Sequence, residues 1–278
     1  MNTGPFLKWA GSKRRLVSAI QCRMPARFNR YIEPFVGSAA VFFGVRPRVA
    51  ILADANLRLI RTYLAIRDNV ESVIELLGDF LNNPVCYDVC RKTSLVVDSL
   101  SDTEVAAWFI FLNKTGYNGL YRVNKQNVFN VPFGKYDKPT ICDTESLRAC
   151  SEALQGVELR HSSFDQIMAG AKPGDFVYAD PPYVPLSATS SFTSYTSDGF
   201  GIDEHRQLRD IALDLANRGV NVLISNSAAP AVLELYRGHQ FHIETTTAVR
   251  NIAASAANRG EVTELLIRNY QPMNSRTA

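Results

Sequence analysis

Residues 175–183 read Asp-Phe-Val-Tyr-Ala-Asp-Pro-Pro-Tyr, which is typical of a buried β-strand that ends at an acidic residue and two prolines. Prolines fix φ and lack an N–H group, so they stop the strand and leave rigid carbonyl acceptors. Open α/β sheets bind ligands at the carboxyl ends of their strands, where Asp180 stands. A carboxylate beside a carbonyl suits an exocyclic amino group, and the Tyr183 ring can stack on a flat heterocycle. An ordinary proline-terminated strand is the alternative.

The sequence on either side of this segment alternates between strand-like and helical patterns, which favours an α/β fold with a largely parallel sheet. Expected strands cover 30–34, 49–54, 175–180, 220–226 and 262–268, and expected helices cover about 13–24, 38–45, 143–155, 162–169 and 203–218. The pattern from 57 to 112 is helical. The runs YRV and VFNV flank the turn-forming NKQN at 124–127, which predicts a β-hairpin.

These patterns predict two domains. The core consists of 1–56 and 145–278, and a helical plus β-hairpin domain is inserted at 57–144. A Ser/Thr-rich stretch at 187–201 is expected to form a mobile loop.

Composition excludes several classes of protein. The 278 residues are 46% hydrophobic and 21% charged, which is enough to bury a core. We find no apolar run long enough for a membrane span and no secretory signal. The five cysteines are scattered and form no Cys-x-x-Cys pair, so neither a disulfide framework nor a zinc ribbon is supported. We expect a soluble, intracellular, globular protein.

The net charge of +3 is unevenly distributed. Residues 1–32 hold seven Lys or Arg and no Asp or Glu, and residues 113–138 hold five Lys or Arg against one Asp. Two basic segments on an acidic remainder favour a polyanionic partner such as DNA or RNA. Solvated surface charge explains the same pattern without a partner.

Two further segments suit a nucleotide-like ligand. Residues 33–39, Glu-Pro-Phe-Val-Gly-Ser-Ala, lead from a strand through a glycine turn into a helix, so backbone N–H groups can approach a ligand. Asp54 ends the next strand, 17 residues after Gly37, where a carboxylate can bind ribose hydroxyls. The full G-x-G-x-x-G pattern is absent, which disfavours a nicotinamide reductase. In residues 6–13, FLKWAGSK, a Trp and two Lys can stack on adenine and neutralise a carboxylate, or form a core Trp between surface lysines.

Taken in order, these segments resemble the Dam family of DNA adenine-N6 methyltransferases, the alpha group of the D12 class. FLKWAGSK, EPFVGSAAVFF, ILADAN and DPPY resemble its S-adenosylmethionine (AdoMet) and catalytic motifs, and GYNGLYR and FNVPFGKY resemble its target-recognition stretches. The resemblance covers nearly the whole chain. It implies a Rossmann-like, doubly wound AdoMet-dependent methyltransferase fold. The implied reaction is methyl transfer to adenine N6 in duplex DNA, in GATC, by base flipping and without a metal.

The resemblance also assigns roles to residues. It implies a catalytic motif of Asp180, Pro181, Pro182 and Tyr183, and AdoMet contacts by Trp9, Lys13, Glu33, Phe35, Gly37, Asp54 and Asp180. It implies DNA contacts by Lys8, Tyr117, Asn118, Leu120, Arg122, Asn130, Pro132 and Lys135. Among these, Lys8 matches a contact to the first base pair, Leu120 and Pro132 match contacts to the third, and Arg122 matches the reader of a guanine. Tyr117 and Asn118 match residues that push into the duplex around the flipped adenine.

The residue pattern agrees with the resemblance at one point. In a strand, Leu120 and Arg122 share one face. A two-stranded ribbon fits the major groove, where Arg can bind guanine O6 and N7 and Leu can touch a thymine methyl. For Arg122, a phosphate contact without base reading is the alternative.

Two positions depart from the family pattern. Ala39 replaces a usual Gly, which has a cost if φ is positive there. Asp137 stands where the family has Lys, which should weaken phosphate contacts and alter processivity and flanking-sequence preference.

Other functions share these features. N-methylation of RNA adenine or of protein glutamine needs the same two acceptors, and a catalytically idle DNA-binding protein can keep the fold. GYNGLYR favours duplex DNA, and the intact DPPY motif and Asp54 disfavour an idle protein. We expect a cytoplasmic, nucleoid-associated enzyme of a bacterium or phage, with no membrane contact and no obligate protein partner.

Overall fold

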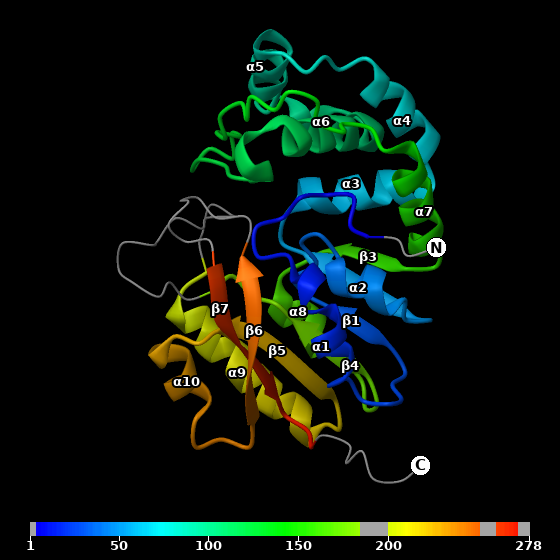
Figure 1. The fold of residues 1–278 in the computed structure, drawn as a ribbon. Helices are drawn as coiled ribbons and strands as arrows, with labels where there is room; N and C mark the ends of the chain where they lie inside the picture. The colour runs from blue at the N-terminus through cyan, green and yellow to red at the C-terminus, as the bar shows by residue number, and fades with distance from the viewer. Residues whose placement is uncertain (1–3, 184–199, 251–259, 272–278) are drawn as a thin grey trace.

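The computed structural model describes residues 4–183, 200–250 and 260–271, and within them seven strands form one sheet (Figure 1). The strands are β1 (Tyr31–Glu33), β2 (Ala50–Asp54), β3 (Glu158–His161), β4 (Phe176–Ala179), β5 (Asn221–Ser227), β6 (His242–Arg250) and β7 (Gly260–Arg268). Their order is β3-β2-β1-β4-β5-β7-β6. Strands β1 to β5 are parallel, and β7 runs antiparallel between β5 and β6. The expected α/β fold with a largely parallel sheet is confirmed.

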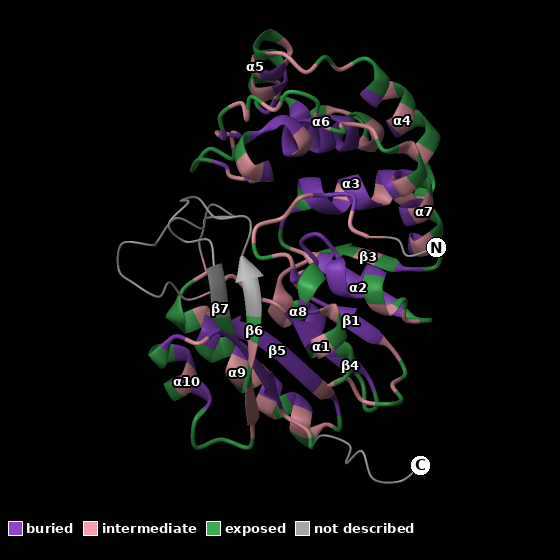
Figure 2. Ribbon diagram, viewed as in Figure 1, coloured by how far each residue is buried: buried purple, intermediate pink, exposed green. Residues whose placement is uncertain are grey.

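Helices cover both faces of the sheet. Along β4, Phe176 and Tyr178 point into one hydrophobic core, and Val177 and Ala179 point into the other. The first core is closed by helices that include α1 (Val17–Gln21), α2 (Ala40–Val45), α3 (Leu57–Asp68) and α7 (Thr144–Leu154). The second is closed by α8 (Phe164–Ala169), α9 (Ile202–Asn217) and α10 (Pro230–Tyr236). Because both faces are covered, the central strands β1, β2, β4 and β5 are buried, as Figure 2 shows, whereas the edge strands β3 and β6 are partly exposed.

The inserted helices extend the first core. Helices α4 (Val70–Gly78), α5 (Pro84–Thr93) and α6 (Asp102–Thr115) lie beyond α3 in Figure 1. A capping box between Ser101 and Glu104 starts α6, whose residues 105–113 are all buried. Helix α3 contacts α6 on one side and β2, β3 and α7 on the other. The expected boundary at residue 57 therefore falls on a helix shared by both parts, and the division into domains stays a prediction.

The expected β-hairpin is replaced by a turn with a single antiparallel bridge, between Val123 and Phe129. Within the loop that this bridge closes, the Asn124 side chain accepts hydrogen bonds from the backbone N–H groups of Gln126 and Val128, at 3.0 and 2.9 Å. The Asn124 side chain thus takes the Val128 N–H, which a longer ladder would use, while the backbone bonds from Asn124 N to Val128 O and from Asn130 N to Arg122 O remain. The hairpin prediction was right about the chain reversal and wrong about the strands.

Other expectations need smaller corrections. The helix expected at 13–24 is a 3-10 turn (Lys13–Arg15) followed by α1. Strands β3 and β6 and helix α10 were not predicted. Most of the expected 187–201 loop lies outside the described residues. Among the helices of the described ranges, none combines the length and the apolar character needed to cross a membrane.

Candidate functional site

Polar side chains meet at the carboxyl edge of the parallel strands. Glu33 and Asp54 end β1 and β2, and Asp180 follows β4. Ser225 lies near the end of β5, and Glu264 of β7 is paired with Ser227 of β5. Each of the five stands two residues from a strand residue of the first core, so all point to that face of the sheet. Ligands of open α/β sheets bind at this edge.

Asp180 is held by two donors on one oxygen. Lys13 Nζ lies 2.8 Å from Asp180 Oδ1, and Ser225 Oγ donates to the same atom at 2.7 Å. The Ser225 hydroxyl also lies 2.9 Å from the hydroxyl of the buried Tyr178. The Lys13 side chain is 4% exposed and the Asp180 side chain 20%, so this ion pair is largely shielded from water.

Tyr183 lies beside the same ion pair. Lys13 Nζ stands 4.6 Å from the centre of the Tyr183 ring, and the Tyr183 hydroxyl donates to Glu264 Oε2 at 2.6 Å. Burial, Asp180 and Glu264 raise the pKa of Tyr183 well above its usual value, so the hydroxyl keeps its proton and acts as the donor. Of the two prolines in between, Pro181 is buried and Pro182 is half-buried. The four residues of the predicted catalytic motif thus lie together.

A glycine turn joins the N-terminal segment to the sheet. Gly37 has a φ of 45°, and a Cβ atom there would lie 2.7 Å from Trp9 Nε1, so the close approach of the indole requires glycine. Trp9 also stacks on Phe109 and Tyr121. Ala39 has a φ of 54°, so its methyl group carries a cost of roughly 1 kcal/mol that glycine would avoid.

Asp54 faces this turn. Its carboxylate accepts the backbone N–H groups of Gly37 and Asn56 at 3.1 and 3.0 Å. Burial nevertheless raises the pKa of Asp54 to about 6. A carboxylate with two backbone donors has lone pairs left for ligand hydroxyls.

Glu33 is buried on the neighbouring strand. The Tyr31 hydroxyl donates to Glu33 Oε2 at 2.8 Å. Burial raises the pKa of Glu33 to about 8, and Asp180 and Asp54 add to the shift. Glu33 is therefore mostly protonated at neutral pH until a cation approaches it.

Phe35 belongs to an aromatic cluster on the other side of the turn. Its ring stacks on Phe164, at the start of α8, with centroids 5.3 Å apart. Phe200 meets the Phe35 ring edge-on at 5.6 Å. The cluster forms an apolar wall next to the polar edge of the sheet.

The predicted DNA contacts lie on residues 116–136, called here the recognition segment, and on Lys8. Lys8 Nζ donates to the Lys114 carbonyl and stands 4.3 Å from the centre of the Tyr136 ring. Burial lowers the pKa of Lys8. Its backbone is fixed by Asn113, which accepts from Lys8 N and donates to Lys8 O. Lys8 is thus held against the recognition segment.

Arg122 and Asn130 interact directly. Arg122 Nε donates to Asn130 Oδ1 at 2.7 Å, and Arg122 Nη2 donates to the Asn130 carbonyl at 3.1 Å. Arg122 and Leu120 are half-buried, whereas Tyr121 and Val123 are buried, so the expected alternation of faces holds without a strand ladder. The turn beyond them is tied to α3, because Arg58 donates to the Asn127 carbonyl at 2.8 Å.

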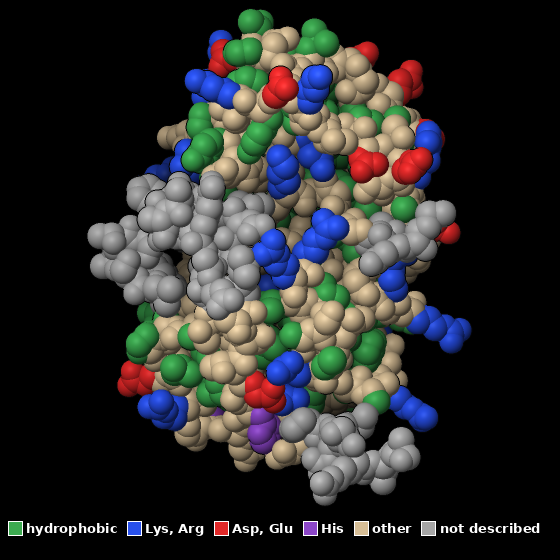
Figure 3. Space-filling model, viewed as in Figure 1, with side chains coloured by type: hydrophobic (Ala, Val, Ile, Leu, Met, Phe, Trp, Pro, Cys, Tyr) green, Lys and Arg blue, Asp and Glu red, His purple; other side chains and the backbone are tan. Residues whose placement is uncertain are grey.

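The remaining predicted DNA contacts are mostly exposed. Tyr117 is 43% exposed, and its backbone N–H donates to the Pro132 carbonyl at 2.9 Å. Asn118 and Lys135 both have positive φ, so they stand in tight turns. Pro132 and Lys135 are exposed. Figure 3 shows Lys and Arg side chains across the middle of one face, between the inserted helices and the sheet.

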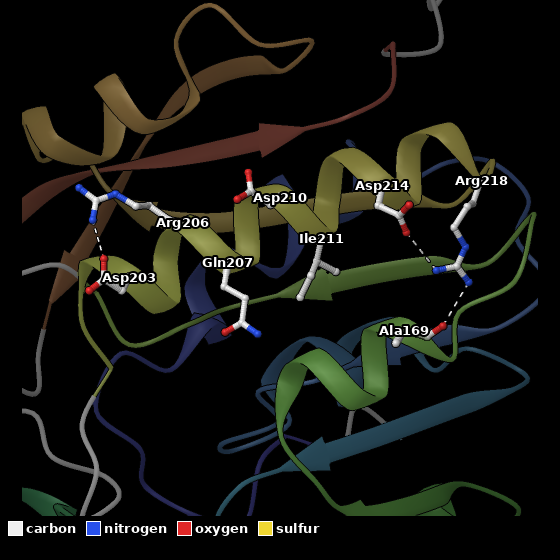
Figure 4. Close-up of a pocket in the computed structure, with 8 residues that line it drawn as sticks. All are labelled: Ala169, Asp203, Arg206, Gln207, Asp210, Ile211, Asp214 and Arg218. Atoms are coloured by element: carbon white, nitrogen blue, oxygen red, sulfur yellow. Dashed lines mark hydrogen bonds and ion pairs between the residues drawn. The ribbon is translucent and has the colours of Figure 1, made fainter.

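A separate groove of about 520 Å³ lies along α9 (Figure 4). Its lining is mainly α9 side chains, among them Asp203, Arg206 and Asp214, with Ala169 of α8. Arg206 pairs with Asp203, and Arg218 pairs with Asp214. The groove contains none of the predicted site residues. No cluster of metal-ligand side chains occurs within the described ranges.

Comparison with known proteins assigns the chain to a class. The model of the D12 class N6 adenine-specific DNA methyltransferases matches residues 9–252, so the chain belongs to this family. Its sheet is therefore that of an AdoMet-dependent methyltransferase.

Individual relatives agree. The chain is 41% identical over 276 residues to Type II methyltransferase M1.LlaDCHI of Lactococcus lactis subsp. cremoris, covering 97% of this chain and 96% of the relative. It is 38% identical over 266 residues to the DNA adenine methylase of Vibrio cholerae (94% of each chain) and 35% identical over 263 residues to that of Escherichia coli K12 (94% and 93%). The predicted family is confirmed, and the protein is an adenine-specific DNA methyltransferase. Its substrate is DNA, and methyltransferases of this kind generally use AdoMet.

The sequence-based reasoning missed several residues of the site. Ser225 follows an apolar run at the end of an expected strand, the same position as Asp180, so the strand-end rule could have found it. Phe164 stands at the start of an expected helix, without a motif. Glu264 lies in the antiparallel strand β7, whose first residues, not its last, lie at the carboxyl edge of the parallel strands. The strand-end rule therefore does not apply to it.

Proposed function

We propose that this enzyme transfers a methyl group from AdoMet to N6 of adenine within GATC in duplex DNA, after flipping the base out of the helix. The observation that carries the proposal is the arrangement of Asp180, Lys13, Ser225 and Tyr183 at the carboxyl edge of the sheet. It combines a fixed carboxylate with an aromatic ring, which is what an amino-substituted heterocycle requires.

The turn at Gly37 fits AdoMet. The cradle is narrow enough that a Cβ atom at Gly37 would contact Trp9, and Asp54 has acceptor capacity suited to ribose hydroxyls. Phe35 offers an apolar wall for the adenine ring, and the buried Glu33 suits a cationic group. When bound, AdoMet supplies an electrophilic methyl group. These residues bind and orient it.

The chain's own residues then activate the target amino group. The lone pair of adenine N6 is delocalised into the ring, so N6 is a poor nucleophile until its hydrogens are drawn out of the ring plane. Lys13 and Ser225 both contact Asp180 Oδ1, so within the described part of the chain Oδ2 is the oxygen placed to accept one N6 hydrogen. The Pro181 carbonyl accepts the other. Both hydrogen bonds strengthen as N6 becomes pyramidal, so they stabilise the transition state more than the ground state.

Tyr183 offsets the cost of extracting the base. Flipping a nucleotide out of duplex DNA costs a few kcal/mol. An aromatic ring held beside the acceptors stacks on the extruded adenine and returns part of that free energy. Tyr183 is the aromatic ring of the motif, next to Lys13 and Asp180.

Target reading is assigned to the recognition segment. The half-buried Arg122 guanidinium is oriented by Asn130, which suits a bidentate contact with guanine O6 and N7. Leu120 and Pro132 offer apolar contact to a thymine methyl, and Lys8 reaches the same surface from the N-terminal segment. The exposed Lys135 suits a backbone phosphate.

Methyl transfer from labelled AdoMet to duplexes that contain GATC, with one base pair changed at a time, tests the proposal. We expect transfer to GATC and a large loss for each substituted pair. Transfer to adenine in another sequence would keep the reaction and contradict the specificity. AdoMet binding with no transfer to any duplex would contradict the proposal and favour single-stranded DNA or RNA, which the same assay can include.

A further inference from the structure

We propose that Glu264 is a positioning residue that holds the Tyr183 ring in the orientation needed to stack on the extruded adenine. The inference rests on the proposed base-flipping function, and it assigns a role to a residue outside the four motif segments. Glu264 contributes through Tyr183 and does not contact the reacting atoms.

The first observation is the burial of Glu264. The residue is 4% exposed, although it carries a carboxylate. A buried carboxylate is unfavourable unless partners compensate for its lost hydration. Its partners are the Tyr183 hydroxyl at 2.6 Å and Lys13 Nζ at 4.0 Å. Both belong to the candidate active site.

The second observation is how firmly Glu264 itself is held. It lies within β7, in register with Ser227 of β5 on one side and Thr246 of β6 on the other. A residue in the interior of a sheet moves little, so its carboxylate is a fixed point for the Tyr183 hydroxyl. Tyr183, in contrast, follows two prolines beyond the end of β4, and the sheet does not hold its backbone.

The third observation is the geometry of the ring. The hydroxyl at one end is bound by Glu264, and Lys13 Nζ stands 4.6 Å from the ring centre. These contacts fix the position of the ring and the direction of its plane. A stacking platform that is already oriented loses less side-chain entropy when the base arrives. Without the hydroxyl contact, the ring loses one of its restraints and adenine N6 is placed less well.

The test uses a matched pair of variants in the full-length protein. Glu264→Met keeps the length of the side chain and removes the acceptor, whereas Glu264→Gln keeps an acceptor oxygen and removes the charge. Tyr183→Phe removes the donor from the other side. We expect Glu264→Met and Tyr183→Phe each to lower kcat on a GATC duplex about tenfold, which corresponds to the loss of one hydrogen bond to a charged group. Glu264→Gln should restore most of that loss.

The double variant Glu264→Met, Tyr183→Phe decides whether Glu264 acts through the tyrosine. If it does, the double variant is no slower than either single variant. Losses that multiply to about a hundredfold would overturn the inference, as would a Gln variant as slow as the Met variant. The Gln variant keeps the test available if Glu264→Met fails to fold.

A spectroscopic measurement separates ring placement from general damage. With 2-aminopurine at the target adenine, fluorescence reports both extrusion of the base and its stacking in the pocket. We expect Glu264→Met and Tyr183→Phe to change this signal alike, with an unchanged Kd for AdoMet. A weakened AdoMet Kd and an unchanged signal would place Glu264 in cofactor binding and overturn the inference.

Two controls complete the design. Glu234 lies on the exposed surface of α10, so Glu234→Met should leave kcat and the 2-aminopurine signal as in the wild type. Wild-type transfer to the duplex is measured in the same assay. Its absence would overturn the proposed function itself, whereas multiplying losses with an active wild type would overturn only the role of Glu264.

Discussion

The carboxyl edge of the sheet and the recognition segment hold their functional side chains in opposite ways. At the edge, the side chains themselves are buried and paired, as the contacts of Lys13, Asp180 and Glu264 show. In the recognition segment the backbone is fixed, and side chains such as Tyr117 and Lys135 remain exposed. The difference is consistent with the two tasks proposed for these regions. Catalysis requires dipoles that are fixed before the reaction, whereas base reading requires groups that can exchange water for base edges.

Replacing Asp180 gives the largest expected effect. In Asp180→Asn, one acceptor for N6 and the charge beside Lys13 are lost together, so kcat should fall at least ~10³-fold, the upper range for removing one preorganised group. DNA binding should change little, because the recognition segment is intact. Single-turnover methyl transfer and filter binding measure the two quantities. The exposed Asp203→Asn is the matched control. Full turnover in Asp180→Asn at saturating AdoMet and DNA would contradict the need for a fixed carboxylate at the edge of the sheet.

The burial of Glu33 at the edge of the sheet can be tested by the pH dependence of stability. Its pKa is raised from 4.5 to about 8, so the unfolded chain loses this proton at lower pH than the folded protein does. The wild type therefore loses stability as pH rises from about 4.5 to 8. Glu33→Gln has no such proton. Between pH 4.5 and about 8, its free energy of unfolding should therefore rise relative to that of the wild type by up to ~4 kcal/mol. Urea unfolding without AdoMet at several pH values measures the difference. A constant difference would mean that Glu33 is hydrated.

Arg122 tests the recognition segment. In Arg122→Ala, discrimination at one G·C pair should fall by about 1–3 kcal/mol, with kcat on saturating GATC duplex nearly kept. Relative kcat/KM on duplexes substituted at that pair gives the value. Asn130→Ala should produce a weaker version of the same change, because Asn130 binds Arg122 Nε. An equal loss on all sequences would assign Arg122 to phosphate contact.

Lys135 gives the smallest expected effect. The side chain is exposed, and in Lys135→Ala binding should weaken similarly for all sequences. The slope of log K against log salt should become shallower by about one unit, which corresponds to one lost phosphate contact. Asp137→Lys, on the same turn, should shift the slope in the opposite direction. Salt titrations of DNA binding measure both variants.

The sequence predicted the parts of the fold that follow local rules. Apolar runs with clear ends gave five of the seven strands seen in the described ranges. Strand β3 was missed because Glu158 and its neighbours are mostly exposed, so the edge strand lacks an apolar pattern. The hairpin prediction went wrong at Asn124, where a side chain competes with the ladder. Hydrophobic periodicity therefore could not have predicted either strand β3 or the turn at Asn124.

The candidate site shows a similar limit. The motifs predicted that Asp54, Asp180 and Tyr183 lie at the carboxyl edge of the sheet, and in the structure Asp54 ends β2 while Asp180 and Tyr183 follow β4. Glu264 has no such signal. Along β7, Glu264 and Arg268 share a face with Leu266, and charged residues at such strand positions normally indicate exposure to solvent. In the folded protein both charged side chains are buried, Glu264 against Tyr183 and Lys13, and Arg268 against Glu244 and Tyr270. Contacts with residues distant in the sequence therefore determine the burial of Glu264.

Lys8 and Lys13 belong to one short segment, which has a consequence for regulation of the reaction rate by DNA. Lys8 lies over the Tyr136 ring of the recognition segment, Lys13 is paired with Asp180, and the Trp9 indole packs against Gly37. A duplex that moves Lys8 therefore acts on a chain whose other end stands in the active site, with Gly11 as the nearest permissive joint. The coupling free energy between DNA binding and AdoMet binding through this segment is the same whichever ligand binds first. If a correct target changes the affinity for AdoMet through this segment, AdoMet changes the affinity for that target by the same factor.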